Sequence, residues 1–341
     1  MPATPSPQVA NCAGENVKLA NYLNEEEIRA VKATSDLKAF FLLGRTWLVI
    51  AAIFTLLTYF PNVFTAIAAG FLLAGQQMAL GAFLHDCAHR GMFRTRAFND
   101  FFGHWFAGVP SLIPLPFYRE YHFLHHRLTG TEHDPDVQNI ANYPVSKCSM
   151  RRKLVRDYTG QSGLKALLGA LLFVNTGRVG NAASMGVQKR ERSRAEILRM
   201  TMKNYAAILL VHGSLFGILF ALGQPWVYLA WWFAHIFFLP GILRIRQIGE
   251  HGAMTQLSGP VRLTTRTTLA NWWQRWLIAP NYINYHCEHH FAPTVPPYNL
   301  PHLNRLLQQR GFYHDHPNAL VSQGYLEVLR LASADRPATA L

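Results

Sequence analysis

Two long stretches of the chain contain no charged side chain and are dominated by apolar residues. The first runs from Thr46 to His85 and the second from Asn204 to Leu243, with no Asp, Glu, Lys or Arg in either. A run of about 18 apolar residues is enough for one membrane-spanning helix, and each stretch is long enough for two. The pattern therefore predicts four membrane helices rather than the core of a soluble domain.

Turn residues divide each stretch near its middle. Pro61 and Asn62 interrupt the first stretch, and the sequence Gly-Gln-Pro at 223–225 interrupts the second. We therefore predict membrane helices over residues 39–60, 63–84, 205–222 and 226–243, arranged as two hairpins. Arg45 falls inside the first helix, close enough to its end for the side chain to reach the headgroup region.

The distribution of positive charge along the chain indicates how the chain is oriented in a membrane. The net charge is +13, which in a soluble protein would suggest a nucleic-acid partner. Here every Lys and Arg lies outside the two charge-free stretches, and the segment 90–203 is densely basic. By the positive-inside rule, both termini and this segment face the cytoplasm and the hairpin tips face the other side. We expect basic surfaces to meet anionic lipid or an acidic partner, and no nucleic acid.

The remaining sequence forms a cytoplasmic cap in this interpretation, over residues 85–204 and 244–330. Residues 101–117 are apolar but broken by three prolines, which favours an interfacial or re-entrant piece over a fifth span. Residues 164–174 are predicted to form a short apolar helix at the membrane surface. The whole chain, 1–341, is expected to be one all-α membrane domain.

Three short histidine strings carry the candidate chemistry. They are His-Asp-Cys-Ala-His at 85–89, His-Phe-Leu-His-His at 122–126 and His-Cys-Glu-His-His at 286–290, and they hold eight of the sixteen histidines. Spacings of three and four residues place side chains on one face of a helix, and neutral imidazole is the commonest metal ligand in proteins. Eight such ligands are too many for one ion. We therefore predict a two-metal centre with ligands His85, His89, His122, His125, His126, His286, His289 and His290.

A ninth ligand and several supporting groups are predicted near the strings. His251 follows the fourth helix on the cytoplasmic side, and Gln247, one turn earlier, is a candidate to hold a metal-bound water. Metal-bound histidines usually donate their second ring N–H to a carboxylate or carbonyl. The acids that suit this role are Asp86, Glu132, Asp134, Glu250 and Glu288. Ligand type alone permits iron, zinc, copper, nickel or manganese.

These strings, with their flanking segments at 129–136 and 284–291, resemble the integral-membrane fatty acid desaturase superfamily. The resemblance covers nearly the whole chain. It implies a stem of four membrane helices, a cytoplasmic cap, and two iron ions held by histidines at these positions, His251 included. It also implies the use of O2 to abstract hydrogen from a fatty acyl chain, with no catalytic residue separate from the metal ligands.

The resemblance also indicates partners and a location. The sequence contains no His-Pro-Gly-Gly haem motif and no iron–sulfur cysteine set, so we expect electrons from a separate ferredoxin, rubredoxin or cytochrome. The substrate would be a fatty acid or fatty acyl lipid. Because the flanking segments resemble bacterial members, we expect the inner membrane of a bacterium, with the active site in the cytoplasm.

Three functional hypotheses remain open at this point. Desaturation of an acyl chain is the leading hypothesis. Hydroxylation of a lipid or alkyl chain, or oxidative decarboxylation of a fatty acid to a terminal alkene, would begin with the same hydrogen abstraction. A metal transporter is disfavoured, because transporters place their ligands near the midplane of the membrane and the strings lie at or beyond helix ends.

Overall fold

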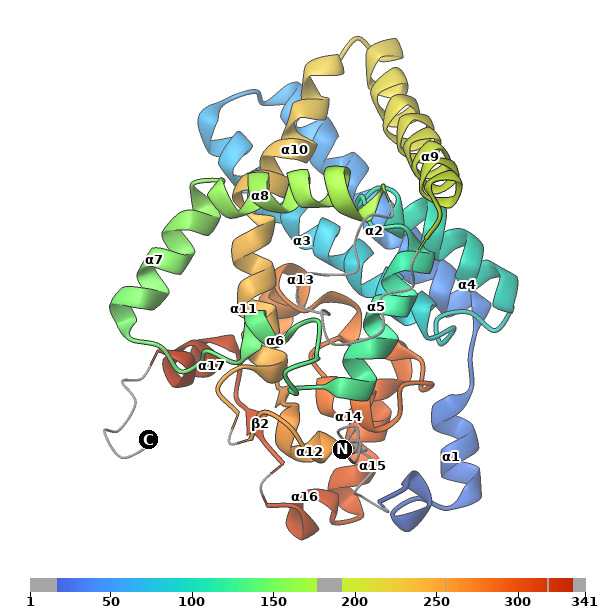
Figure 1. Ribbon diagram of the computed structural model, residues 1–341, viewed down its shortest axis with the longest axis vertical. Coiled ribbons are helices and arrows are strands. Elements are labelled where there is room, and N and C mark those ends of the chain that lie inside the picture. Colours follow the sequence, from blue (N-terminus) through green and yellow to red (C-terminus); the bar gives the residue numbers. More distant parts are fainter. Residues whose placement is uncertain (1–16, 177–191, 255, 318, 334–341) are drawn as a thin grey trace, which may run out of the picture.

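Helices dominate the computed structural model, which describes residues 17–176, 192–254, 256–317 and 319–333. Among the described residues, α2 (Asp36–Tyr59), α3 (Val63–Ala88) and α9 (Arg194–Ala221) each contain a stretch long and apolar enough to cross a membrane. The pair α10 (Tyr228–Phe237) and α11 (Leu239–His251) forms a fourth candidate, bent by 41°. In Figure 1, α9 and α10 lie at one end of the molecule and α12, α15 and α16 at the other.

The predicted turns lie where the long helices end. Asn62 accepts hydrogen bonds from the backbone N–H groups of Phe64 and Thr65, which caps the first turn of α3. At the second turn, α9 ends at Ala221 and Gly223 takes a left-handed conformation with φ of +73°. The breaks at Pro61–Asn62 and at residues 223–225 are therefore confirmed.

The second and third predicted helices are longer in the structure, and the first begins three residues earlier than predicted, at Asp36. The second predicted helix stopped at residue 84, but α3 continues to Ala88, so His85 lies within the helix and His89 at its C-cap. The third was predicted to begin at residue 205, but α9 begins at Arg194 after an N-cap formed by Ser193 and Glu196. Hydropathy marks only the apolar part of a helix, whereas a capping box starts a helix inside polar sequence.

The fourth predicted helix, 226–243, is divided by a bend at Phe238, and its second part, α11, continues past residue 243 to end at His251, which was predicted to follow the helix. Pro240 has no backbone N–H, and its ring excludes the carbonyl of residue 236 four positions earlier. That carbonyl, on Ile236, faces Gly163 of α8 (Gln161–Gly169), where an added Cβ atom would lie only 2.0 Å from the oxygen. The bend therefore allows α8 to pack closely against the end of α10.

The contact at Gly163 leads to a stability prediction. Replacing Gly163 with Ala should lower the free energy of unfolding by about 1–3 kcal/mol, because the new methyl group forces α8 away from the backbone of α10. Gly169, at the other end of α8, has no atom within 4 Å of its Cβ position and provides the matched control. Thermal unfolding in detergent measures both variants, and equal stability of the two would refute the close packing of Gly163 against α10.

The long helices pack around α3 and expose apolar residues on their outer sides. The core between α2, α3 and α10 contains Ile50, Leu73, Phe83 and Trp231, all at most 1% exposed. By contrast, exposed apolar side chains cover the outer faces, including Leu48 (72%), Phe64 (80%) and Leu209 (72%). A soluble helical bundle does not expose apolar surface on this scale, which indicates a membrane environment for these helices.

Short helices and one small sheet form the rest of the described chain. Before the central gap lie α4 (Arg96–Gly103), the π-helix η2 (His104–Gly108), α5 (Leu115–Leu128), α6 (Val137–Ile140), α7 (Lys147–Tyr158), α8 and the π-helix η3 (Ala170–Val174). None of α4, η2 and α5 is long enough to span a membrane, in agreement with the prediction for 101–117. The short apolar helix predicted at 164–174 is confirmed as Gln161–Val174.

The C-terminal third wraps around the ends of α3 and α11. It contains α12 (Val261–Thr264), α13 (Trp272–Leu277), the 3-10 helix η6 (Pro280–Tyr282), α14 (His286–Phe291), α15 (Leu300–Gln309), α16 (Phe312–Asp315) and α17 (Tyr325–Ala332). Strands β1 (Thr267–Thr268) and β2 (Val321–Ser322) pair in parallel. A second apolar core joins α15 and α16 to α1 (Glu25–Lys32) through Leu303, Phe312 and Val31.

Candidate metal centre

Nine histidines carried by α3 and its C-cap, α5, α11 and α14 lie close together. They form two groups, in each of which one ligand atom per residue lies within 4.8 Å of all the others. The five-histidine group comprises His85, His89, His122, His126 and His289, and the four-histidine group comprises His125, His251, His286 and His290. These nine residues are the nine predicted ligands.

Helix geometry divides each His-x-x-His-His string between the two groups. On α5, His122 and His126 are four residues apart and share a face, while His125 points to the other group. On α14 the assignment is reversed, since His286 and His290 join the four-histidine group and His289 the five-histidine group. The groups are adjacent, because the rings of His126 and His290 stack with centroids 4.0 Å apart.

Within each group the Nε2 atoms face one another. In the five-histidine group, Nε2 of His126 lies 2.9 Å from that of His122 and 3.2 Å from that of His289. In the other group, Nε2 of His251 lies 2.8 Å from that of His286 and 3.2 Å from that of His125. Two nitrogens bound to one metal at about 2.1 Å and at a right angle are about 3.0 Å apart. The spacing therefore fits a shared ion in each group.

Buried nitrogens without a partner support the same interpretation. The Nε2 atoms of His85, His89 and His290 are buried and make no hydrogen bond to any described residue. A buried polar atom left unpaired costs about 1–3 kcal/mol, so a fold does not collect three of them at one place without a compensating ligand. The donor set, all imidazole and largely shielded from water, suits transition-metal ions.

Three of the opposite ring nitrogens are held by the surrounding protein. Nδ1 of His125 lies 2.8 Å from Asp134, Nδ1 of His85 lies 3.0 Å from Asp86, and Nδ1 of His251 lies 2.9 Å from the carbonyl oxygen of Thr264. These contacts place the ring proton on Nδ1 and leave Nε2 free to bind metal. Asp134 is fully buried and also accepts the backbone N–H groups of Gly130 and Asp136, which fixes its orientation.

Glu250 supports the four-histidine group less directly. Its carboxylate lies 3.6 Å from Nδ1 of His286, too far for a hydrogen bond but close enough for charge interaction. Arg246, one turn earlier on α11, lies 3.2 Å from the same carboxylate. Both side chains are largely buried. Burial raises the pKa of Glu250 to about 7, and the positive charge of Arg246 opposes that rise.

Three of the predicted supporting residues make no hydrogen bond or ion pair with the nine histidines. The Glu132 carboxylate is 86% exposed and pairs with His133. Glu288 points away from the histidines of its own string and accepts hydrogen bonds from Thr267, Asn304 and Tyr313, which anchors α14 to its neighbours. Gln247 is half-buried on α11 and makes no hydrogen bond to a described residue.

Other residues around the site were not predicted from sequence. Arg119 donates to the carbonyl oxygens of Cys87 and Ala88, which fixes the end of α3 that carries His85 and His89. Tyr118 stacks on His122 with ring centroids 5.3 Å apart. Tyr118 and His122, like Arg246 and Glu250, are four residues apart, a spacing that signals contact on one helix face. No sequence signal identifies the Arg119 contacts or the Thr264 carbonyl.

The other histidines of the described chain lie outside both groups. They are His104, His133, His212, His235, His302, His314 and His316. His212 on α9 forms a hydrogen bond of 3.1 Å with the Tyr228 hydroxyl on α10. This pair links two of the long helices, a structural role rather than a metal-binding one.

Burial keeps most of the grouped histidines neutral, which leads to a pH prediction. Removal from water, followed by repulsion from neighbouring imidazoles, lowers the pKa of each of five residues well below its usual value: His122, His126, His286, His289 and His290. His125 differs, since Asp134 raises its pKa in spite of burial. Neutral imidazole is the form that binds metal.

Because the unfolded chain binds more protons than the native chain, stability should fall as the pH drops through about 6.5, the unfolded histidine value. For each histidine that stays neutral in the native state, the free energy of unfolding falls by about 1.4 kcal/mol per pH unit below that value. Thermal unfolding of metal-free protein between about pH 7.5 and about pH 5.5 checks this. Metal-loaded protein should unfold at a higher temperature than metal-free protein, since bound metal competes with protons for the imidazole nitrogens. A melting temperature independent of pH would contradict the neutral state of these side chains.

Comparison with known protein sequences shows which proteins this chain is similar to. The family sequence profile described as "Fatty acid desaturase" matches residues 58–321, which include all nine histidines. A dihydrorhizobitoxine desaturase of Bradyrhizobium elkanii is 26% identical over 246 residues, covering 71% of this chain and 67% of the relative. A fatty acid desaturase of Bacillus subtilis is 26% identical, covering 69% of this chain and 65% of the relative.

A third relative is an sn-1 oleoyl-lipid 12-desaturase of Synechocystis, which is 25% identical over 64% of this chain and 62% of its own length. The chain therefore spans about two thirds of the length of the curated relatives it matches. The names of these relatives describe different substrates, dihydrorhizobitoxine in one case and an oleoyl lipid in another. The comparisons thus indicate a shared chemistry with divergent substrates.

Proposed function

Because the chain belongs to the fatty acid desaturase family, we propose that it is a membrane enzyme that introduces a double bond into a fatty acyl chain, with two iron ions held by the nine histidines. The single observation that carries this proposal is the convergence of five and four histidines, through their Nε2 atoms, in two adjacent groups. Two iron ions held in these groups would supply the activation of O2 that removal of hydrogen from an unactivated C–H bond requires.

The side chains of this protein prepare the centre in three ways. Asp134, Asp86 and the Thr264 carbonyl orient imidazole rings before any metal binds. Burial of the four-histidine group and of His85, His122 and His289 in the other group limits the access of bulk water to a strongly oxidising reaction. The Arg246–Glu250 pair places a carboxylate 3.6 Å from Nδ1 of His286, on the side of the ring away from its Nε2 atom.

The same proposal includes a place in the cell. The helices α2, α3, α9 and the bent pair α10–α11 would form the membrane stem, in two hairpins, and residues 85–204 and 244–330 the cytoplasmic cap of a single domain, 1–341. The exposed apolar faces of the long helices support a stem. The basic segment 90–203 supports a cytoplasmic cap in a bacterial inner membrane. The termini, proposed to be cytoplasmic, lie outside the described residues.

The position of the histidines favours an enzyme over a metal transporter. His85 and His89 lie at the last turn of α3, and His251 is the last residue of α11. A transport site would be expected near the middle of the spans. The proposed partners are a fatty acid or fatty acyl lipid as substrate, the surrounding membrane lipids, O2, and a separate ferredoxin, rubredoxin or cytochrome as electron donor.

Lipid analysis of cells that express the protein tests the reaction. Mass spectrometry should reveal acyl chains that have lost two hydrogens, present with the wild-type chain and absent with a variant that lacks a ligand histidine. Chains that have gained an oxygen would instead show a hydroxylase. A terminal alkene in the headspace, one carbon shorter than the fatty acid, would show a decarboxylase. Lipids and volatiles identical to those of the empty-vector strain would contradict all three reactions.

A further inference from the structure

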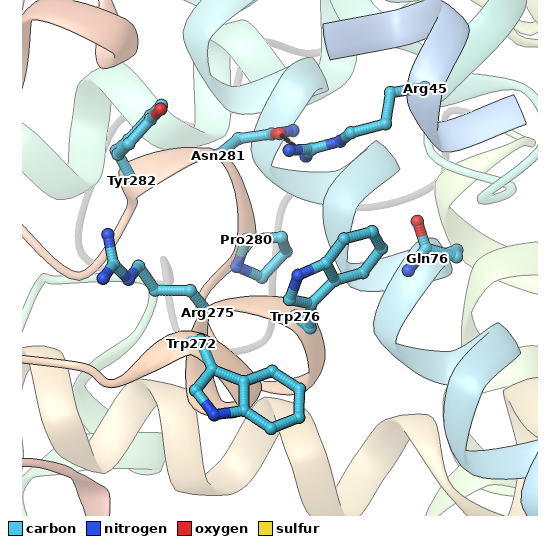
Figure 2. A pocket seen from close by; sticks show the side chains of 8 residues that line it. All are labelled: Arg45, Gln76, Trp272, Arg275, Trp276, Pro280, Asn281 and Tyr282. Atoms are coloured by element: carbon cyan, nitrogen blue, oxygen red, sulfur yellow. Dashed lines mark hydrogen bonds between the residues drawn. The ribbon is translucent and has the colours of Figure 1, made fainter. Parts of the chain in front are cut away.

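A second site of interest lies away from the histidines, between α2, α3, α13 and η6. Figure 2 shows this pocket, which has a volume of about 190 Å³. The residues that line it include Arg45, Gln76, Trp272, Arg275, Trp276 and Tyr282. Two arginines and two tryptophans in one small pocket form a combination that the proposed reaction does not use.

The positive charge in the pocket has no protein counter-charge. Arg45 donates to the side-chain oxygen of Asn281 at 2.9 Å and stacks on Trp276 at 5.5 Å, but its Nε is buried and has no partner among the described residues. The Arg275 side chain makes no hydrogen bond or ion pair with the described part of the chain. No acidic residue lines the pocket. A partly buried guanidinium without a carboxylate is costly, which points to an anion from outside the protein.

Gln76 provides an independent sign of a ligand. It is 3% exposed, on α3, and its side-chain amide makes no hydrogen bond to a described residue. Figure 2 shows it across the pocket from Arg275. The amide opens onto the pocket that Gln76 lines, so its hydrogen-bonding groups are available to a molecule bound there. A ligand oxygen in the pocket would accept from the amide and from the arginines.

The setting of the pocket identifies the kind of ligand. Trp272 is 73% exposed and Trp276 42% exposed, and exposed tryptophans of membrane proteins gather at the membrane–water interface. Arg45 lies nine residues after the start of α2 at Asp36, or about 14 Å along the helix, within the proposed stem. A charged residue at this depth faces lipid headgroups and the upper part of their chains rather than bulk water.

We propose that this pocket binds the phosphate group of an anionic phospholipid in the cytoplasmic leaflet. Guanidinium groups match phosphate oxygens in shape and charge. Arg45 and Arg275 would contact the phosphate, the Gln76 amide would donate a further hydrogen bond, and the two indoles would cover the glycerol and the first part of the acyl chains. A headgroup without its own cation, such as phosphatidylglycerol, balances the two arginines better than phosphatidylcholine does.

The lipid site is separate from the metal centre. Gln76 and His85 are nine residues apart on α3, about 14 Å along the helix. The inference rests on the proposed insertion in the membrane but not on the proposed reaction. Its readout is therefore lipid binding, which a protein without metal or activity would still display.

Native mass spectrometry of the detergent-purified protein, with lipids added one at a time, tests the proposal. The wild-type chain should retain phosphatidylglycerol about tenfold more tightly than phosphatidylcholine, a difference of about 1.4 kcal/mol. Diacylglycerol, which has no phosphate, should not be retained. The variants Arg275→Gln and Arg45→Gln should each lose the preference for phosphatidylglycerol. Arg330→Gln is the matched control, because Arg330 is exposed on α17, far along the chain from the pocket.

The outcomes separate the possible sources of the anion. Arg275 is exposed, so its replacement leaves the fold intact even if the Arg45 variant proves unstable. Loss of the preference in the Arg275 variant, with the control unchanged, supports the site. Equal retention of all three lipids by the wild-type chain would overturn it. Displacement of the lipid by inorganic phosphate at the same concentration would also overturn it, since the pocket would then be a site for the free ion.

Discussion

Replacement of His125 with Ala is expected to abolish product formation and to remove metal from the four-histidine group. His125 supplies one of the four clustered Nε2 atoms and is buried, so water cannot take its place without rearrangement of the group. Loss of supporting partners around a metal costs about 10- to 100-fold in affinity or activity, and loss of a ligand should exceed the upper end of that range. Product should be measured by mass spectrometry, and iron by elemental analysis.

The matched control for this variant is His302→Ala. His302 is an exposed histidine on α15 that belongs to neither group. It should keep full activity and the wild-type iron content, so that any loss in the His125 variant reflects its position rather than the number of histidines. Full activity of the His125 variant would refute the assignment of this group to the reaction.

Replacement of Asp134 with Asn is expected to weaken metal binding about 10- to 100-fold while the ligand set stays complete. Asp134 accepts the ring proton of His125 at 2.8 Å and two backbone N–H groups, and its pKa is lowered by His125 and by those bonds in spite of burial. Asn keeps the shape but not the charge, so His125 becomes a weaker and less firmly oriented ligand. Competition with a chelator measures the affinity, and excess iron should restore part of the activity.

Glu132 provides the control for Asp134. It lies two residues earlier, carries the same charge, and has an exposed carboxylate that does not contact the grouped histidines. Glu132→Gln should therefore bind metal like the wild-type chain. If both variants lose metal equally, a general change in charge is responsible and the positioning role of Asp134 is wrong.

The long helices were predictable because their cause is local. Charge-free apolar runs and the turn residues Pro61, Asn62 and Gly223 are written in consecutive sequence, and the structure has helices and turns at those places. The bend at Phe238 was missed, although Pro240 was a visible signal for it. The close packing of Gly163 against Ile236 joins residues more than seventy positions apart, which sequence periodicity does not reveal.

The grouping of the histidines was also predictable, since spacing on a helix decides which side chains share a face. The choice among supporting acids was not. Asp134 and Glu132 are two residues apart in the same loop, yet one is buried against His125 and the other faces solvent. Glu288 lies between two predicted ligands and still points to the opposite side of α14, toward Thr267 and Asn304. Only tertiary packing determines these directions.

The central claim is that the nine histidines hold two iron ions. Elemental analysis combined with Mössbauer spectroscopy of the purified protein, grown with labelled iron, tests it most directly. We expect two irons per chain in two similar nitrogen-rich environments, and about one iron per chain in the His125→Ala variant. Zinc in place of iron in an active preparation, or a single iron per chain at full activity, would contradict it.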